Sequence, residues 1–350
     1  MRARGRQPVW AAAIVAVAAL TIVSAAGAQG TSKAGQGSGK PFAPAKTPDG
    51  QPDLQGIWGY ATITPLERPG DLAGKATFSD EEAANFERDT LARRDNDRRD
   101  DDPTRTPAVV NGQRATADVA RAYNQFWWDY GTKVVGTKRT SLVVDPPDGR
   151  IPALTPKAAA RQDARRAAAE RTASGPEDRG LGERCINWGV AGPPMRPGAY
   201  NNNMQLVQTK DTVVILNEMI HDARVIPIDG RPHGTLRQWM GDSRGHFEGN
   251  TLVVETINFT DQTSFNGSDE NMKLTERFTK LDPDTLLYEF TIDNPTAFTK
   301  PFTVQVPMSK SGLPMFEYAC HEGNYGMFGI LAGARALDRA AAEAAKKGSN

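Results

Sequence analysis

The chain has four histidines, and all of them stand between residues 221 and 321. The first two share one short segment with acidic and basic side chains, which runs from His221-Asp222-Ala223-Arg224 to His233. An imidazole moves protons near neutral pH, a carboxylate orients it, and a guanidinium holds negative charge. These are the functions that an acid–base active site needs, so we expect this segment to belong to the functional site.

We expect five side chains to carry metal-independent acid–base chemistry. Two histidines are alternative bases, an acidic neighbour of each is its orienting partner, and an arginine holds an anionic group or developing negative charge. In chain order these candidate catalytic residues are His221, Asp222, Arg224, His321 and Glu322. The alternative for each is a turn residue or a cross-strand partner with no catalytic role.

Eight further side chains stand at predicted strand ends or in predicted loops, where a ligand would be bound. In chain order these candidate ligand-binding residues are Asn202, Asn203, Glu218, His233, Trp239, Asp242, Arg244 and Tyr325. We expect the stretch from Trp239 to His246 to be a loop that precedes a strand at 251–259.

Metal and cofactor chemistry have little support in the sequence. A catalytic zinc needs three protein ligands, which histidines and Glu218 would supply if the fold brought them together, but no helical HExxH motif or close His-x-His pair is present. A Gly-x-Ser-x-Gly nucleophile elbow is also missing. We therefore expect no metal ligands and no cofactor.

The only two cysteines, Cys185 and Cys320, form a candidate disulfide, with two separate buried thiols as the alternative. If the bridge forms, it holds His321 beside the segment 183–188, which is the kind of preorganisation that a catalytic base requires. An oxidising compartment would favour the bridge.

The N-terminus predicts export. Arginines at positions 2, 4 and 6 precede an apolar run from Val9 to Val23 and then Ala26-Gly27-Ala28, which is typical of a secretory signal peptide over residues 1–28. The alternative is a retained membrane anchor, although the run is shorter than a spanning helix needs. We expect a periplasmic or secreted protein with no stable membrane anchor after cleavage. The mature chain would carry a formal charge of −3, which argues against nucleic acid as a partner.

The remaining sequence predicts a flexible leader at 29–50 and one mainly β domain at 51–335. Dense, half-buried strands beyond Asn201 alternate apolar and polar residues, as in Leu286, Tyr288, Phe290 and Ile292. Short turns between them predict an antiparallel meander that closes into a lipocalin-like barrel or folds into a sandwich. Inserted helices are expected at about 79–94, 117–130 and 157–172, and a helical or disordered tail at 336–350.

Four strings in this chain resemble those of a group of exported bacterial proteins of unknown function. They are Tyr200-Asn201-Asn202-Asn203, Met219-Ile220-His221-Asp222-Ala223-Arg224, Gly241-Asp242-Ser243-Arg244-Gly245 and Tyr318-Ala319-Cys320-His321-Glu322-Gly323-Asn324. The resemblance covers roughly residues 54–335 and implies a family without an activity. Separately, Gly56-Ile57-Trp58 is similar to the opening strand of lipocalin-type barrels, from which this chain departs in its length and its inserted helices.

The sequence is compatible with three functions. The protein is a periplasmic enzyme acting on a small organic molecule, anionic or glycosidic, or a non-catalytic binder of such a molecule, or a structural component of the envelope. The group of ionisable residues favours the enzyme, because a binder of apolar ligands needs fewer of them. The sequence does not define the oligomeric state.

Overall fold

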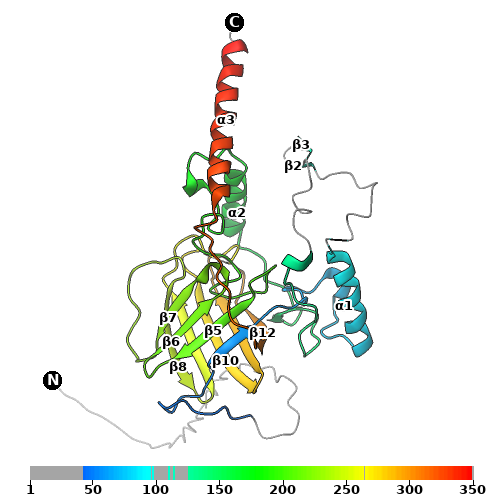
Figure 1. Ribbon diagram of the computed structural model, residues 1–350, viewed down its shortest axis with the longest axis vertical. Coiled ribbons are helices and arrows are strands. Elements are labelled where there is room, and N and C mark those ends of the chain that lie inside the picture. Colours follow the sequence, from blue (N-terminus) through cyan, green and yellow to red (C-terminus); the bar gives the residue numbers. More distant parts are fainter. Residues whose placement is uncertain are drawn as a thin grey trace, which may run out of the picture. The chain divides into compact units, whose positions relative to one another are not determined.

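Nine strands of a ten-stranded antiparallel sheet form a nearly closed barrel in this computed structural model (Figure 1). The structure describes residues 42–95, 97, 109–110, 113–114, 125–263 and 265–348, so the expected signal peptide lies outside the described residues. The strand order around the barrel is β7-β6-β5-β1-β12-β11-β10-β9-β8. The bounds are β1 Gly56–Gly59, β5 Asn203–Gln208, β6 Thr212–Asn217, β7 Ala223–Pro227, β8 Asp242–Glu248, β9 Thr251–Ile257, β10 Lys273–Asp282, β11 Thr285–Asp293 and β12 Phe302–Lys310.

Strand β1 joins two meanders into one sheet. One meander is β5 to β7 and the other is β8 to β12, and within each of them every strand pairs with the next one in sequence. Trp58 of β1 pairs with Met204 of β5 on one side and with Lys310 of β12 on the other. The prediction of an antiparallel β fold is therefore confirmed, and of its two forms the barrel is the one observed. A short strand, β4 (Val143–Asp145), pairs with the opposite end of β12.

The barrel closes between β7 and β8 by side-chain packing, because these two strands share no ladder. Gly245 of β8 faces β7 so closely that a Cβ atom there would lie 2.9 Å from Cγ2 of Ile228 and 3.1 Å from Cγ2 of Ile226. The inside is filled by large side chains, which include Trp58 and the alternating residues predicted for β11. The barrel is thus a packed core and not an open cup.

Strand β8 corrects the expectation of a loop at Trp239 to His246. Its sequence Asp-Ser-Arg-Gly-His-Phe-Glu lacks alternating apolar residues, yet Ser243 and Gly245 face the interior and are buried. Ser243 Oγ lies 2.9 Å from Thr256 Oγ1 of β9, so the hydroxyl is satisfied inside the barrel. Small inward residues give no hydrophobic signal, and for this reason the strand could not be recognised by its pattern.

Two of the expected helical insertions are present. Helix α1 spans Asp80–Arg94 and has the predicted capping box, in which the Ser79 hydroxyl accepts from the Glu82 amide and the Glu82 carboxylate accepts from the Ser79 amide. Helix α2 spans Pro156–Ala169 with Thr155 as its N-cap. Short 3-10 segments occur at Gly70–Leu72, Gln125–Trp127, Pro176–Asp178 and Met219–His221, and a two-stranded pair is formed by β2 (Val109–Val110) and β3 (Gln113–Arg114).

The helix expected at 117–130 does not extend over its last six residues. Residues 117–124 lie outside the described part, Gln125–Trp127 form one 3-10 turn, and 128–130 are irregular. The main chain of Asp129 is held on both sides, since its amide donates to Ala199 O at 2.7 Å and its carbonyl accepts from Asn202 Nδ2 at 2.6 Å. The rings of Trp128 and Tyr130 are stacked, with their centroids 5.3 Å apart.

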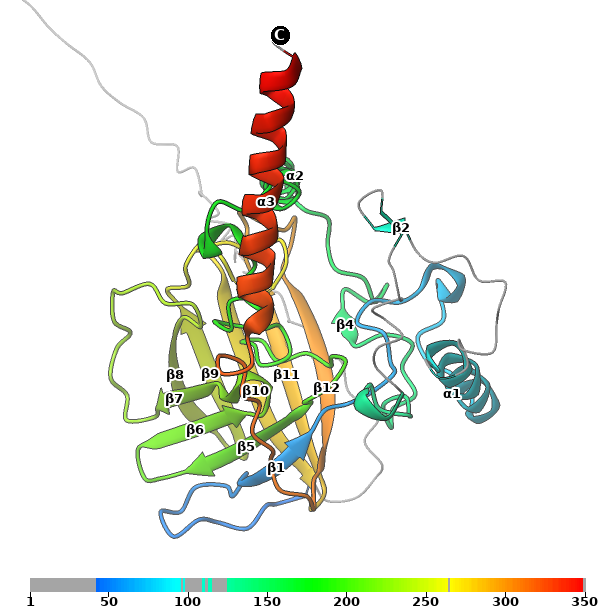
Figure 2. The same cartoon turned by 45° about the horizontal axis from the view of Figure 1, so that its top comes forward.

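Helix α3 spans Tyr325–Gly348, so the C-terminal helix begins earlier than the expected tail at 336. In both ribbon views α3 and α2 lie at the same end of the barrel (Figures 1 and 2). Arg335 of α3 donates to the carbonyl oxygens of Ala173 and Ser174, just beyond α2. Among the helices that the structure describes, none has a stretch apolar and long enough to cross a bilayer.

Candidate functional site

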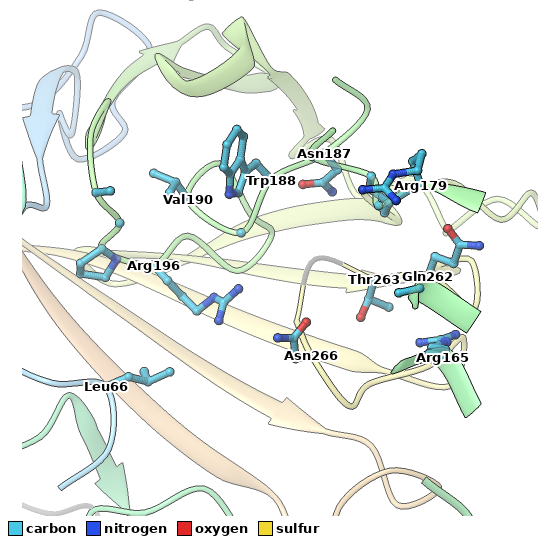
Figure 3. A pocket seen from close by; sticks show the side chains of 18 of the residues that line it. Leu66, Arg165, Arg179, Asn187, Trp188, Val190, Arg196, Gln262, Thr263 and Asn266 are labelled. Carbon is cyan, nitrogen blue, oxygen red and sulfur yellow. The ribbon is translucent and has the colours of Figure 1, made fainter. Parts of the chain in front are cut away.

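A pocket of about 870 Å³, here called the main pocket, is larger than three further pockets of about 650, 660 and 300 Å³ (Figure 3). All of its lining residues lie outside the barrel strands. Most of them come from the long loop 177–199, the end of α2 and the chain that follows β1. The others are Arg94, Tyr130, Leu142, Gln262, Thr263 and Asn266. Loops held on a rigid barrel are a common setting for ligand binding.

The loop 177–199 is fixed to the barrel and to the segment between β12 and α3. Cys185 forms a disulfide with Cys320, so the predicted bridge is present. The Tyr60 hydroxyl donates to Val190 O at 3.1 Å, and the Met195 amide donates to the Tyr288 hydroxyl at 3.1 Å. These anchors hold the pocket wall without help from a ligand, so the site is largely preformed.

Asn187 is the most unusual side chain of this wall. It is only 3% exposed, and neither its Oδ1 nor its Nδ2 has a hydrogen-bond partner in the part of the chain that the structure describes. A buried amide without partners costs free energy, so such a group calls for an explanation. In Figure 3 Asn187 and Trp188 lie on one side of the pocket, and Asn266 and Thr263 lie on the other.

Arg196 extends its guanidinium into the space between these two walls (Figure 3). The guanidinium lies over the ring of Phe265, 4.8 Å from its centroid. Burial lowers the pKa of Arg196, against an opposing effect of Tyr288, but an arginine remains charged at neutral pH. The charge of this guanidinium is therefore partly desolvated.

The lining of the main pocket contains more positively than negatively charged side chains. Four arginines line it, against two carboxylates, Glu177 and Asp178. The arginines are Arg94, Arg165, Arg179 and Arg196. Arg179 is bound by Glu183, and Arg165 donates to Asp261 O at 2.7 Å, so these two are oriented by the protein. An excess of guanidinium groups in one cavity attracts an anionic ligand.

Two of the five candidate catalytic residues share a small pocket of about 300 Å³. His221 and Glu322 both line it, together with Glu218. His221 is exposed, its Nδ1 lies 3.0 Å from Tyr318 O, and its φ of 46° follows a φ of 60° at Ile220. Left-handed backbone at two β-branched or bulky residues in succession is strained, which is a feature of functional sites.

Asp222 follows this strained turn. Burial raises the pKa of its carboxyl to about 6, although the charge of His221 opposes the shift. Its Oδ2 is buried and has no hydrogen-bond partner among the residues described. The carboxyl is thus held where its protonated form is favoured.

Arg224 and His321, the other two candidates, lie elsewhere. Arg224 points into the barrel and binds Glu276 through two hydrogen bonds of 2.6 and 3.0 Å. Glu276 also accepts from the Tyr288 hydroxyl at 2.7 Å. His321 is exposed beside the disulfide and lines none of the four pockets. The structure therefore does not bring the five side chains to one place.

The candidate ligand-binding residues are mostly engaged in structural contacts. Asp242 accepts from the Gly234 amide at 2.7 Å, lies 3.2 Å from His233 Nδ1 and binds Arg244, so these residues fix the loop before β8. Trp239 lies with Arg224 and Asp242 on a third pocket of about 660 Å³.

A second group of these residues lies near the start of β5. Asn202 bonds to the main chain of Asp129 and Gly198, and Asn203 donates to Glu218 at 2.8 Å. Glu218 also accepts from the Phe316 amide at 3.0 Å.

The last candidate ligand-binding residue, Tyr325, lies apart from this group and is exposed at the start of α3.

The main pocket contains none of the thirteen predicted site residues. Asn187 and Arg196 were missed because they stand in a Gly- and Pro-rich loop with no motif around them. One signal was available: Asn187 is two residues from Cys185, and a disulfide holds neighbouring side chains in place.

Within the described residues, no group of three His, Cys, Asp or Glu side chains is arranged to hold a metal ion. No protein-family model matches the chain, and a search of curated proteins finds no match.

Proposed function

We propose that this protein binds a small organic anion in the main pocket. The observation that carries the proposal is the guanidinium of Arg196, partly buried inside a cavity of about 870 Å³ that three further arginines line. A cavity of this size suits a small organic molecule. A guanidinium in surroundings of low dielectric attracts a carboxylate or phosphate more strongly than it does in water, and it binds these groups at two points.

Binding is preferred to catalysis because of how the ionisable groups are placed. The main pocket has arginines and amides but no histidine, and its carboxylates are two neighbours on one short segment, Pro176–Asp178. Such a lining recognises an anion without an evident base. Ligand binding therefore explains the composition of this lining better than catalysis does.

Acid–base catalysis at the small pocket is a second candidate function. His221 and Glu322 line that pocket together, and Asp222, whose pKa is about 6, follows His221 in the chain. An imidazole beside a carboxyl whose pKa is raised to about 6 is an arrangement that proton transfer can use. The variant His221→Ala and the unaltered protein, assayed side by side for turnover of a panel of small carboxylate and phosphate esters, test this candidate: equal turnover of every substrate by both proteins would exclude it.

The binding proposal is tested by calorimetry with a panel of carboxylates and phosphates. We expect at least one anion to bind, and Arg196→Gln to weaken it by tenfold or more. The matched control is Arg231→Gln, which removes the same charge from an exposed arginine that is paired with Asp229 and does not line the main pocket. If both variants weaken binding equally, only the net charge matters and the site is not the main pocket. If no anion binds, a structural envelope role gains support.

We also propose that the chain is exported and acts in the periplasm, as its resemblance to exported bacterial proteins suggests. The Cys185–Cys320 disulfide is compatible with a location outside the cytoplasm. Mass spectrometry of the protein from a periplasmic fraction tests this proposal. A mass equal to that of the chain without residues 1–28 supports cleavage after Ala28. An uncleaved chain found in the cytoplasm would contradict export.

A further inference from the structure

We infer that the ligand of the main pocket is a hydroxylated anion, such as a sugar acid, whose hydroxyl groups bind Asn187 while its anionic group binds Arg196. This inference rests on the proposed function and narrows it. Its starting point is Asn187, a buried side chain of the pocket whose two polar atoms have no hydrogen-bond partner among the described residues.

An asparagine amide presents one acceptor and one donor group side by side, whichever way its two ends are assigned. Both atoms of Asn187 are buried and without a partner among the described residues. A ligand group that satisfies them must therefore donate and accept at adjacent positions. A hydroxyl, or a pair of neighbouring hydroxyls, does both.

An ionised carboxylate or a fully ionised phosphate cannot do the same. It accepts hydrogen bonds only, so it would satisfy Nδ2 of Asn187 and repel Oδ1. An apolar group would satisfy neither atom. The anionic part of the ligand is better placed on Arg196, and a separate hydroxylated part is needed for Asn187. The two requirements together describe a hydroxy acid.

The rest of the lining fits such a molecule. Asn266 and Gln262 bring further amides to the wall that faces Asn187, and amides are suited to hydroxyl groups. Trp188 lies next to Asn187 on the pocket wall with its indole packed on Gly182, and it is 38% exposed. Its ring offers an apolar surface for the C–H face of a sugar ring.

The test measures, by calorimetry, the binding of ligands built on one six-membered ring to the unaltered protein. The probes are glucuronate and galacturonate as sugar acids, cyclohexanecarboxylate as the anion without hydroxyls, and galactose as the neutral sugar. We expect a sugar acid to bind at least tenfold more tightly than the other two classes. This comparison does not depend on the folding of any variant.

The variant Asn187→Leu assigns the effect to one residue. It keeps a similar size and removes both polar atoms, so we expect it to weaken the sugar acid by ten- to a hundredfold and to leave cyclohexanecarboxylate unchanged. Because a buried amide without partners is removed, its thermal unfolding temperature should not fall. A lower unfolding temperature would assign Asn187 a structural role and overturn the inference.

The remaining outcomes separate this inference from the proposed function. Equal binding of cyclohexanecarboxylate and the sugar acids, with no effect of Asn187→Leu, would overturn the hydroxyl requirement and leave anion binding intact. Binding of galactose alone, unaffected by Arg196→Gln, would overturn both. Failure of every sugar acid to bind while cyclohexanecarboxylate binds would also overturn the inference.

Discussion

Arg224 on β7 and Glu276 on β10 form a two-point ion pair inside the barrel, with Nη1–Oε2 at 2.6 Å and Nη2–Oε1 at 3.0 Å. The two strands belong to different meanders, so the pair connects them across the seam between β7 and β8. Both side chains are buried, and the Tyr288 hydroxyl donates to the same carboxylate. Because Nη1 and Nη2 of Arg224 both donate to Glu276, these two atoms are not available to the carboxylate of a ligand.

Replacing Arg224 by Met should destabilise the protein by about 3–5 kcal/mol, because it leaves Glu276 buried without its counter-charge. Adding Glu276→Gln to that variant should restore part of the loss, since no buried charge then remains and Tyr288 keeps its acceptor. Urea denaturation of the two single variants and the double variant measures the coupling. A single variant as stable as the unaltered protein would contradict a buried, fully ionised pair.

The Cys185–Cys320 disulfide should contribute substantially to stability. It closes a loop with a sequence separation of 135 residues. Constraint of so long a loop in the unfolded state is worth about 4–5 kcal/mol in the chain-entropy model. The double variant Cys185→Ser, Cys320→Ser should lose about this free energy of unfolding under non-oxidising and oxidising conditions alike. The unaltered protein should match it only after reduction, and equal stability throughout would contradict the bridge.

The strands of the barrel were predictable where one face is apolar. In β11, Tyr288 and Phe290 face inward and alternate with exposed or half-buried neighbours, and this period of two is visible in the sequence. Strand β8, in contrast, was not predictable from its sequence. Ser243 and Gly245 face inward there because little room is left beside β7 and β9, and small residues leave no periodic signal.

The disulfide was predictable because only two cysteines exist. The candidate site was not, because proximity in sequence does not give proximity in space. Asp222 and Arg224 are two residues apart, yet Arg224 points into the barrel while Asp222 lies at the turn before β7. Asn187 and Arg196, in contrast, acquire their significance only from burial within a folded loop, which no local pattern reports.

The carboxyl of Asp222 predicts a dependence of stability on pH. Its pKa in the folded protein is raised to about 6 from an ordinary value of 3.8, so the folded state binds a proton more tightly than the unfolded state does. The free energy of unfolding should therefore fall as pH rises from about 4 to about 6, and the loss should be complete above that range. Asp222→Asn should be more stable than the unaltered protein by about 1–3 kcal/mol at pH 7.5, and nearly equal to it at pH 4.

The matched control for this prediction is Asp229→Asn. Hydrogen bonds from Arg231 lower the pKa of Asp229, so its ionised form is favoured and its replacement should bring no gain at pH 7.5. Urea denaturation at several pH values, run on both variants, gives the comparison. Equal pH profiles for Asp222→Asn and the unaltered protein would show that the Asp222 carboxyl is as well solvated as an ordinary one.

The seam between β7 and β8 yields the last prediction, because Gly245 is what lets the two strands approach. A Cβ atom at this position would lie 2.9 Å from Cγ2 of Ile228 and 3.1 Å from Cγ2 of Ile226, and neither methyl group is at the end of a flexible chain. Gly245→Ala should therefore cost about 1–3 kcal/mol through overpacking. Gly136→Ala is the matched control, since nothing lies within 4 Å of its Cβ position, and it should be neutral or slightly stabilising. If Gly245→Ala proved as stable as that control, β7 and β8 would have to lie further apart in solution, and the barrel would be open at this seam.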